Sequence, residues 1–299
     1  MSTLENSADT TAGPRLPDTL RLGPVHLTVS DLGRSIAYYE RSVGLRCHRR
    51  DGDTAALGAG GEDLVVLAEV PGATSGGRHA GLYHLALLFP TREALAHAVL
   101  RLARSETRLE GASDHGVSEA IYLRDPDNNG IELYADRPRD AWPPPRAPAD
   151  RIEMYTIALD LRSLLDSVAG DEPQEHAGRG LVMGHVHLHV ADVDRALAFY
   201  RDVLGFEVMV NIGSAAFLAA GGYHHHLGLN VWLGPGARPR PDDAAGLRHW
   251  VVVLERPDEV EAVRARVLAA GLAQEERPGG FLVRDPWGTA VAVSTTAGA

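Results

Sequence analysis

The feature that most constrains the fold of this chain is an internal repeat. Several segments of the first half recur in the second half, in the same order and with closely similar residues. The matching pairs are 23–31 with 184–192, 34–39 with 195–200, 43–45 with 204–206, 81–84 with 246–249, and 125–126 with 285–286. A match sustained over this length indicates two homologous domains.

Each half of the chain itself contains two similar units. The strand-like runs 23–29 and 81–87 carry a histidine at the same place, His26 and His84, and a helical pattern follows each run. About three short β-rich segments come after each helix, so the repeating unit reads strand, helix and three strands. The sequence therefore predicts an α+β fold in which four such units occur in two tandem domains.

The boundaries follow from composition. We expect a flexible tail over 1–20, a first domain with a metal site over 21–137, and a degenerate second domain over 181–296. Residues 138–180 are expected to form a proline-rich linker that contains a short helix. Proline fixes φ and removes a backbone donor, so the most proline-rich part of this linker cannot form a helix or a central strand.

Composition excludes some partners. The net charge of −11 over 299 residues would repel phosphate backbones and anionic lipid surfaces, so we expect neither nucleic acid nor membrane as a partner. The single cysteine, Cys47, cannot form an intramolecular disulfide, which suits a reducing compartment. A signal peptide typically starts with basic residues that are followed by an apolar stretch, and the first residues of this chain lack that pattern. We therefore expect the chain to be cytoplasmic.

Two histidines and one glutamate of the first half are candidate metal ligands. Non-haem iron oxygenases use two imidazoles and one carboxylate on one face of Fe(II), which leaves the other positions open. His26, His84 and Glu132 offer that donor set, and all three lie in strand-like runs. A single strand histidine is more often a hydrogen-bonded core residue, so the repeated placement of the two histidines carries this prediction.

The repeat plan resembles the vicinal-oxygen-chelate superfamily, which includes glyoxalase I, bleomycin-resistance proteins and type I extradiol dioxygenases. The similarity extends from about Leu22 to Thr295, and it implies βαβββ modules that pair into half-open cups around a metal. The segment 115–132 is similar to the extradiol dioxygenase signature: a histidine, an aliphatic–tyrosine pair, an acidic–proline turn and a glutamate. It departs from that pattern at Ser113 and Asn128.

The resemblance implies a catechol-2,3-dioxygenase-like enzyme that cleaves an aromatic diol with O₂. Its metal would be Fe(II), or alternatively Mn(II), held by His26, His84 and Glu132. Tyr122 would hydrogen-bond a catecholate oxygen and His115 would orient the bound ring. The additional histidine that serves such enzymes as acid–base has no counterpart at the matching upstream position, so the proton donor is left unassigned.

The second half retains histidines but not the carboxylate. His187 and His249 match the histidines of the first half, whereas Ala292 stands where the glutamate would be. A second metal site of His187, His226 and His249 is one interpretation, and a hydrogen-bonded polar core is the other.

Two other functions are compatible with the resemblance. One is a glyoxalase-like isomerase or lyase, whose site often has two glutamates; the other is a metal-free small-molecule-binding protein. The absence of a glutamate in the middle of the strand 63–68 argues against the first, and the presence of the candidate triad argues against the second. The sequence leaves open whether the chain forms a homo-oligomer.

Overall fold

The computed structural model describes residues 13–74, 77–146 and 150–297, and it contains four successive βαβββ units. The expected order of strand, helix and three strands is confirmed in every unit. The first is β1 (Arg21–Val29), α1 (Leu32–Tyr38), β2 (Arg46–Asp51), β3 (Thr54–Gly58) and β4 (Asp63–Glu69); the second is β5 (Gly81–Phe89), α2 (Arg92–Arg104), β6 (Leu109–Asp114), β7 (Ser118–Arg124) and β8 (Gly130–Asp136). The third is β10 (Val182–His189), α4 (Val193–Phe199), β11 (Glu207–Asn211), β12 (Ala215–Ala219) and β13 (Leu227–Asn230); the fourth is β14 (Gly246–Val253), α5 (Pro257–Ala269), β15 (Gln274–Arg277), β16 (Gly280–Arg284) and β17 (Ala290–Ser294).

Two large curled sheets are built from paired units, but the partners differ from the expectation. The eight-stranded sheet has the order β15-β16-β17-β14-β1-β4-β3-β2, and the nine-stranded sheet has the order β11-β12-β13-β10-β5-β8-β7-β6-β9. The first unit therefore pairs with the fourth, and the second pairs with the third. The expected half-open sheets of paired units are confirmed, but each sheet combines one unit from each half of the chain. Homologous units offer equivalent strand edges, so the sequence does not say which edges meet.

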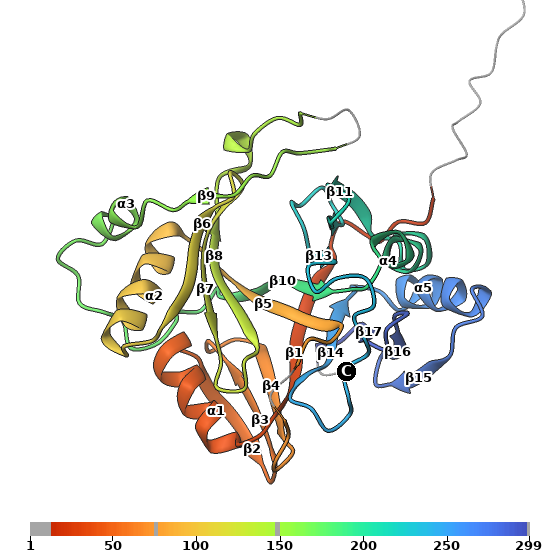
Figure 1. Cartoon of the computed structure of the whole chain (residues 1–299), viewed down its shortest axis with the longest axis horizontal. Coiled ribbons are helices and arrows are strands. Elements are labelled where there is room, and N and C mark those ends of the chain that lie inside the picture. Colours follow the sequence, from red (N-terminus) through yellow and green to blue (C-terminus); the bar gives the residue numbers. More distant parts are fainter. Residues whose placement is uncertain (1–12, 75–76, 147–149, 298–299) are drawn as a thin grey trace, which may run out of the picture.

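The helices keep each half of the chain together. In Figure 1, α1 and α2 lie on one side of the molecule, whereas α4 and α5 lie on the other. Arg101 of α2 is buried and donates hydrogen bonds to the carbonyls of Ser42 and Val43, at the end of the turn that follows α1. Arg266 of α5 repeats this contact in the second half, with the carbonyls of Val203 and Leu204. Such donors satisfy carbonyls that a helix end leaves unpaired.

The linker includes the expected short helix, α3 (Leu161–Asp166), and a short strand, β9 (Ile157–Ala158). Residues 150–158, which we call the strap, connect the two ends of the nine-stranded sheet. At one end the Arg151 amide donates to the Met209 carbonyl of β11, and at the other β9 pairs with β6. The strap thereby covers the open side of this curled sheet (Figure 1).

The predicted tail is only partly testable, since residues 1–12 lie outside the described residues. Leu16 and Leu20 are buried in the main hydrophobic core, so this part of the predicted tail packs against the fold. Among the helices that the structure describes, none is long and apolar enough to cross a bilayer.

Candidate metal centre

His84 and Glu132 lie together because their strands are parallel neighbours. On β5 and β8, Ala86 pairs with Glu132, and His84 is two residues before Ala86 on the same face of the sheet. His84 Nε2 lies 3.0 Å from Glu132 Oε2. Two of the three predicted donors are therefore brought together.

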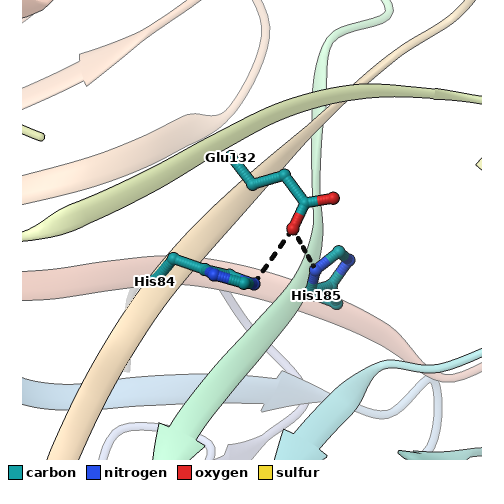
Figure 2. Close-up of side chains that lie close together, drawn as sticks. All are labelled: His84, Glu132 and His185. Carbon is teal, nitrogen blue, oxygen red and sulfur yellow. Dashed lines mark hydrogen bonds and ion pairs between the residues drawn. The ribbon is translucent and has the colours of Figure 1, made fainter. Parts of the chain in front are cut away.

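The third donor of this cluster comes from the other half of the chain. His185 on β10 pairs with Ala86 of β5, and its Nε2 lies 3.2 Å from the same Glu132 Oε2. Figure 2 shows the three side chains pointing toward one another from three strands. Their ligand atoms all lie within 4.8 Å of one another, and no other such group of three occurs among the described residues.

The cluster fits a divalent cation. All three residues are buried, with exposed fractions of 5% for His84, 3% for Glu132 and 1% for His185. His84 Nε2 is buried and lies close to the Glu132 carboxylate, but the two atoms are not aligned for a regular hydrogen bond. Burial would raise the pKa of Glu132, but the neighbouring imidazoles outweigh it and hold this pKa well below its usual range. Burial lowers the pKa of His185 to about 4. An ionised carboxylate and a neutral imidazole are the forms that bind a metal.

His26, the third predicted ligand, is not part of this cluster. It lies on β1 in the eight-stranded sheet, where it pairs with His249 and its ring stacks on that of His249 at 3.9 Å. The predicted convergence of His26 with His84 and Glu132 was wrong because β1 and β5 belong to different sheets.

The sequence carried a signal for His185 that was missed. His84, His185 and His249 each stand seven positions before the N-cap of the next helix, at Thr91, Asp192 and Arg256. In the first unit this position is Pro24, because His26 is only five positions before its N-cap Asp31. Counting residues back from the N-cap of each helix aligns His84 with His185, whereas matching the strand segments by sequence aligned it with His26 and His187.

A cavity of about 430 Å³ opens beside the cluster. His84 and Glu132 line it, together with the two residues predicted to be catalytic, His115 and Tyr122. His115 Nδ1 lies 3.0 Å from the Tyr155 carbonyl, which can only accept, so Nδ1 carries a proton. In the neutral ring, His115 Nε2 then accepts a hydrogen bond from the Tyr122 hydroxyl at 2.7 Å. Burial, and then the nearby charge of Glu132, raises the pKa of Tyr122 well above its usual value.

The proposed second-domain site is not assembled. His187 lines the same cavity as His84, and its Nε2 accepts a hydrogen bond from the Asn230 side chain at 3.0 Å. His226 Nδ1 accepts from the Ala220 amide, and His249 lies in the other sheet. The prediction that His187, His226 and His249 converge was therefore wrong, and the hydrogen-bonded interpretation describes His187 and His226.

A chain of polar groups that the sequence did not indicate runs from the cavity to Asp136, at the end of β8. His225 lines the cavity, and its Nδ1 lies 2.7 Å from His224 Nδ1. His224 Nε2 lies 2.8 Å from the carboxylate of Asp136. The carboxylate accepts, so His224 donates from Nε2 and accepts at Nδ1 from the His225 Nδ1–H. This assignment leaves His225 Nε2 as a free base.

Comparisons with known proteins agree with this architecture. The sequence profile of the glyoxalase/bleomycin resistance protein/dioxygenase superfamily matches residues 21–133 and 182–293. The chain belongs to this superfamily. It is 43% identical over 270 residues to a catechol-2,3-dioxygenase of Bacillus subtilis (strain 168), covering 89% of this chain and 93% of that protein.

Solved structures of lower identity share the fold of this superfamily member. A proposed dioxygenase from Bacillus subtilis superposes with a TM-score of 0.66 at 12% identity, covering 95% of this chain and 86% of that one. Glyoxalase I from Zea mays superposes with a TM-score of 0.57 at 19% identity, covering 92% of each chain.

Within this superfamily member, the position of Glu132 has counterparts in the other units. Glu132 pairs with Ala86, the residue two positions after His84. Two positions after His185 is His187, which pairs with Gly228. Two positions after His249 is Val251, which pairs with Ala292. A Cβ at Gly228 would lie 2.7 Å from the His187 ring, so a side chain there would have to displace that ring. The nine-stranded sheet therefore offers one carboxylate at these positions.

Proposed function

We propose that this protein is a metal-dependent extradiol dioxygenase that cleaves the ring of an aromatic diol with O₂. The observation that carries the proposal is the buried group of two imidazoles and one carboxylate beside a cavity that also contains Tyr122 and His115. The name of the 43% identical relative supports the same activity.

In this proposal His84, Glu132 and His185 hold Fe(II), with Mn(II) as the alternative, because these ligand types suit both ions. The bound ion would supply Lewis acidity and a shared binding position for the diol and O₂. His84 and Glu132 line the cavity, whereas His185 does not, so the substrate side of the centre is the side that faces Tyr122.

Tyr122 would hold the diol in place. Its high pKa keeps the hydroxyl protonated at neutral pH, so that it can donate a hydrogen bond to a substrate oxygen. In the free protein that hydrogen bond goes to His115, and His115 is fixed by the Tyr155 carbonyl. The strap residue Tyr155 thereby orients both side chains.

The sequence left the acid–base residue, the proton donor, unassigned, and we assign this role to His225. Burial lowers its pKa well below the usual value, and its Nδ1–H is held by His224, so its Nε2 is an available base at neutral pH. Asp136 in turn fixes the tautomer of His224. A positioned base of this kind removes a proton from the bound diol and returns it later in the reaction.

The glyoxalase-like alternative is disfavoured by Gly228. A site with two glutamates would place the second at the position that mirrors Glu132, and no carboxylate is available there. A metal-free binding protein is disfavoured because the buried ligand atoms of His84, Glu132 and His185 all lie within 4.8 Å of one another. We retain a cytoplasmic location as part of the proposal, since the one cysteine, Cys47, is free.

The test is anaerobic loading of the purified protein with Fe(II), followed by O₂ uptake with catechol. We expect O₂ consumption and a yellow ring-fission product, both of which Glu132→Ala abolishes. Ala292→Ser, at the mirrored position in the other sheet, is the matched control and keeps the activity. Undiminished turnover in Glu132→Ala, or no O₂ uptake by the iron-loaded wild type, would overturn the proposal.

A further inference from the structure

The cavity is larger than a catechol ring needs. A protein cavity of about 150 Å³ is enough to bind benzene. The present cavity is about 430 Å³, so a ring held at the metal centre leaves room for a second group of similar size.

An apolar part of the cavity wall, outside the three-residue cluster, comes from separate segments. Met154 belongs to the strap, Val210 and Ile212 belong to or follow β11, and Trp232 follows β13. Ile212 is 61% exposed and Trp232 is 51% exposed, although both line the cavity. Large apolar side chains gathered at the rim of a cavity are typical of ligand-binding surfaces.

Trp232 is held in place at this rim. Its amide donates to Asn230 Oδ1 at 3.1 Å, and its ring meets Tyr83 edge-on, with centroids 5.4 Å apart. Its ring also lies 5.5 Å from that of His187. The rim is therefore ordered by contacts with the inner wall.

The cavity offers no free cation to an acidic substrate. Of the lining residues that the structure describes, Arg124 alone has a fixed positive charge. Its guanidinium lies 2.7 Å from the Glu110 carboxylate and also donates to the Asn128 carbonyl at 2.9 Å. A carboxylate on the substrate would have to compete with Glu110 for it.

From these observations we infer that the outer half of the cavity is a subsite for an apolar substituent. The substrate class is then an aromatic diol that carries an alkyl or aryl group and no carboxylate. The inference rests on the proposed function, which supplies the diol end of the ligand. Each methylene group buried from water strengthens binding roughly fourfold, so a butyl group has scope for a gain of at least tenfold.

Anaerobic calorimetry on the full-length, Fe(II)-loaded protein tests the subsite through dissociation constants. The probes are catechol, 4-butylcatechol and 3,4-dihydroxybenzoate. We expect 4-butylcatechol to bind at least tenfold more tightly than catechol, and 3,4-dihydroxybenzoate to bind no more tightly than catechol. The ratio between 4-butylcatechol and catechol should fall at least threefold in Ile212→Ser and in Trp232→Ala.

Leu268→Ser is the matched control, because Leu268 is 56% exposed and lies on α5, outside the cavity lining. It should leave the ratio unchanged, which separates the subsite from a general effect of surface hydrophobicity. A ratio near one in the wild type, or equal ratios in Ile212→Ser and Leu268→Ser, would overturn the subsite. Failure to consume O₂ with a preserved binding ratio would overturn the dioxygenase function and leave the apolar subsite standing.

Discussion

The two histidines of β10 allow a direct test of the proposed centre. His185 and His187 point to the same face of one strand, yet the structure gives them different partners. His185 Nε2 lies 3.2 Å from Glu132, whereas His187 Nε2 is occupied by the Asn230 amide. We predict that His185→Ala impairs metal binding and that His187→Ala has a much smaller effect on it.

The size of the effect follows from the ligand count. Structural sites with four ligands bind Zn²⁺ with about 10–16 kcal/mol, which corresponds to about 2.5–4 kcal/mol for each ligand. Loss of one of three ligands should therefore weaken Fe(II) binding by roughly 10²- to 10³-fold. His187 Nε2 accepts a hydrogen bond from Asn230 instead, so replacing His187 should change the affinity by less than about tenfold and should affect substrate binding or stability more strongly.

The assay is anaerobic Fe(II) titration against a competing chelator, with Glu132→Gln as the reference for loss of a ligand. Thermal denaturation of each variant establishes that the protein has folded. Full metal content in His185→Ala together with loss of metal in His187→Ala would refute the assignment.

Three further predictions concern catalysis and stability. His225→Gln should lower kcat about 10²-fold while Fe(II) and catechol affinities change less than threefold, as measured by steady-state kinetics and titration. Burial raises the pKa of Asp125 to about 6 from 3.8, so its contribution to folding is greatest below pH 4 and is lost as pH rises through 6. Chemical denaturation at pH 4 and pH 7 should therefore show a loss of up to about 3 kcal/mol from this group that is absent in Asp125→Asn. Arg101→Leu should lower the unfolding free energy by about 3–5 kcal/mol, because it leaves three carbonyls without their donor. Arg266→Leu, at a half-buried site, should cost only about 1–2 kcal/mol.

Local patterns in the sequence predicted the local structure well. The alternation of strands and helices, the α+β class, and the short linker helix are all present in the structure. Strand periodicity also predicts that Glu132 lies on the opposite face of its strand from Ile131 and Leu133. These features depend on residues that are close in sequence or lie in one βαβββ unit.

The third donor depended on the pairing of units, which local patterns do not encode. His26 and His185 both lie on the first strand of a unit, and either unit could in principle pair with the second unit. The pairing is decided by long-range packing, including the contact of β5 with β10 and the strap that connects β11 with β6. Such contacts are selected by the whole core rather than by any one segment.

The pairing of units also explains why one metal centre is expected in a chain with four equivalent units. The nine-stranded sheet combines a unit that carries His84 and Glu132 with a unit that carries His185. At the corresponding positions the eight-stranded sheet has His249 but also Pro24 and Ala292, so it lacks both a second imidazole and a carboxylate. Had the first unit paired with the second, Pro24 would have faced His84 in place of His185. Between a first-unit and a third-unit partner for the strand that carries His84, only the third unit supplies the second imidazole, so the choice of strand partner determines which donors meet Glu132.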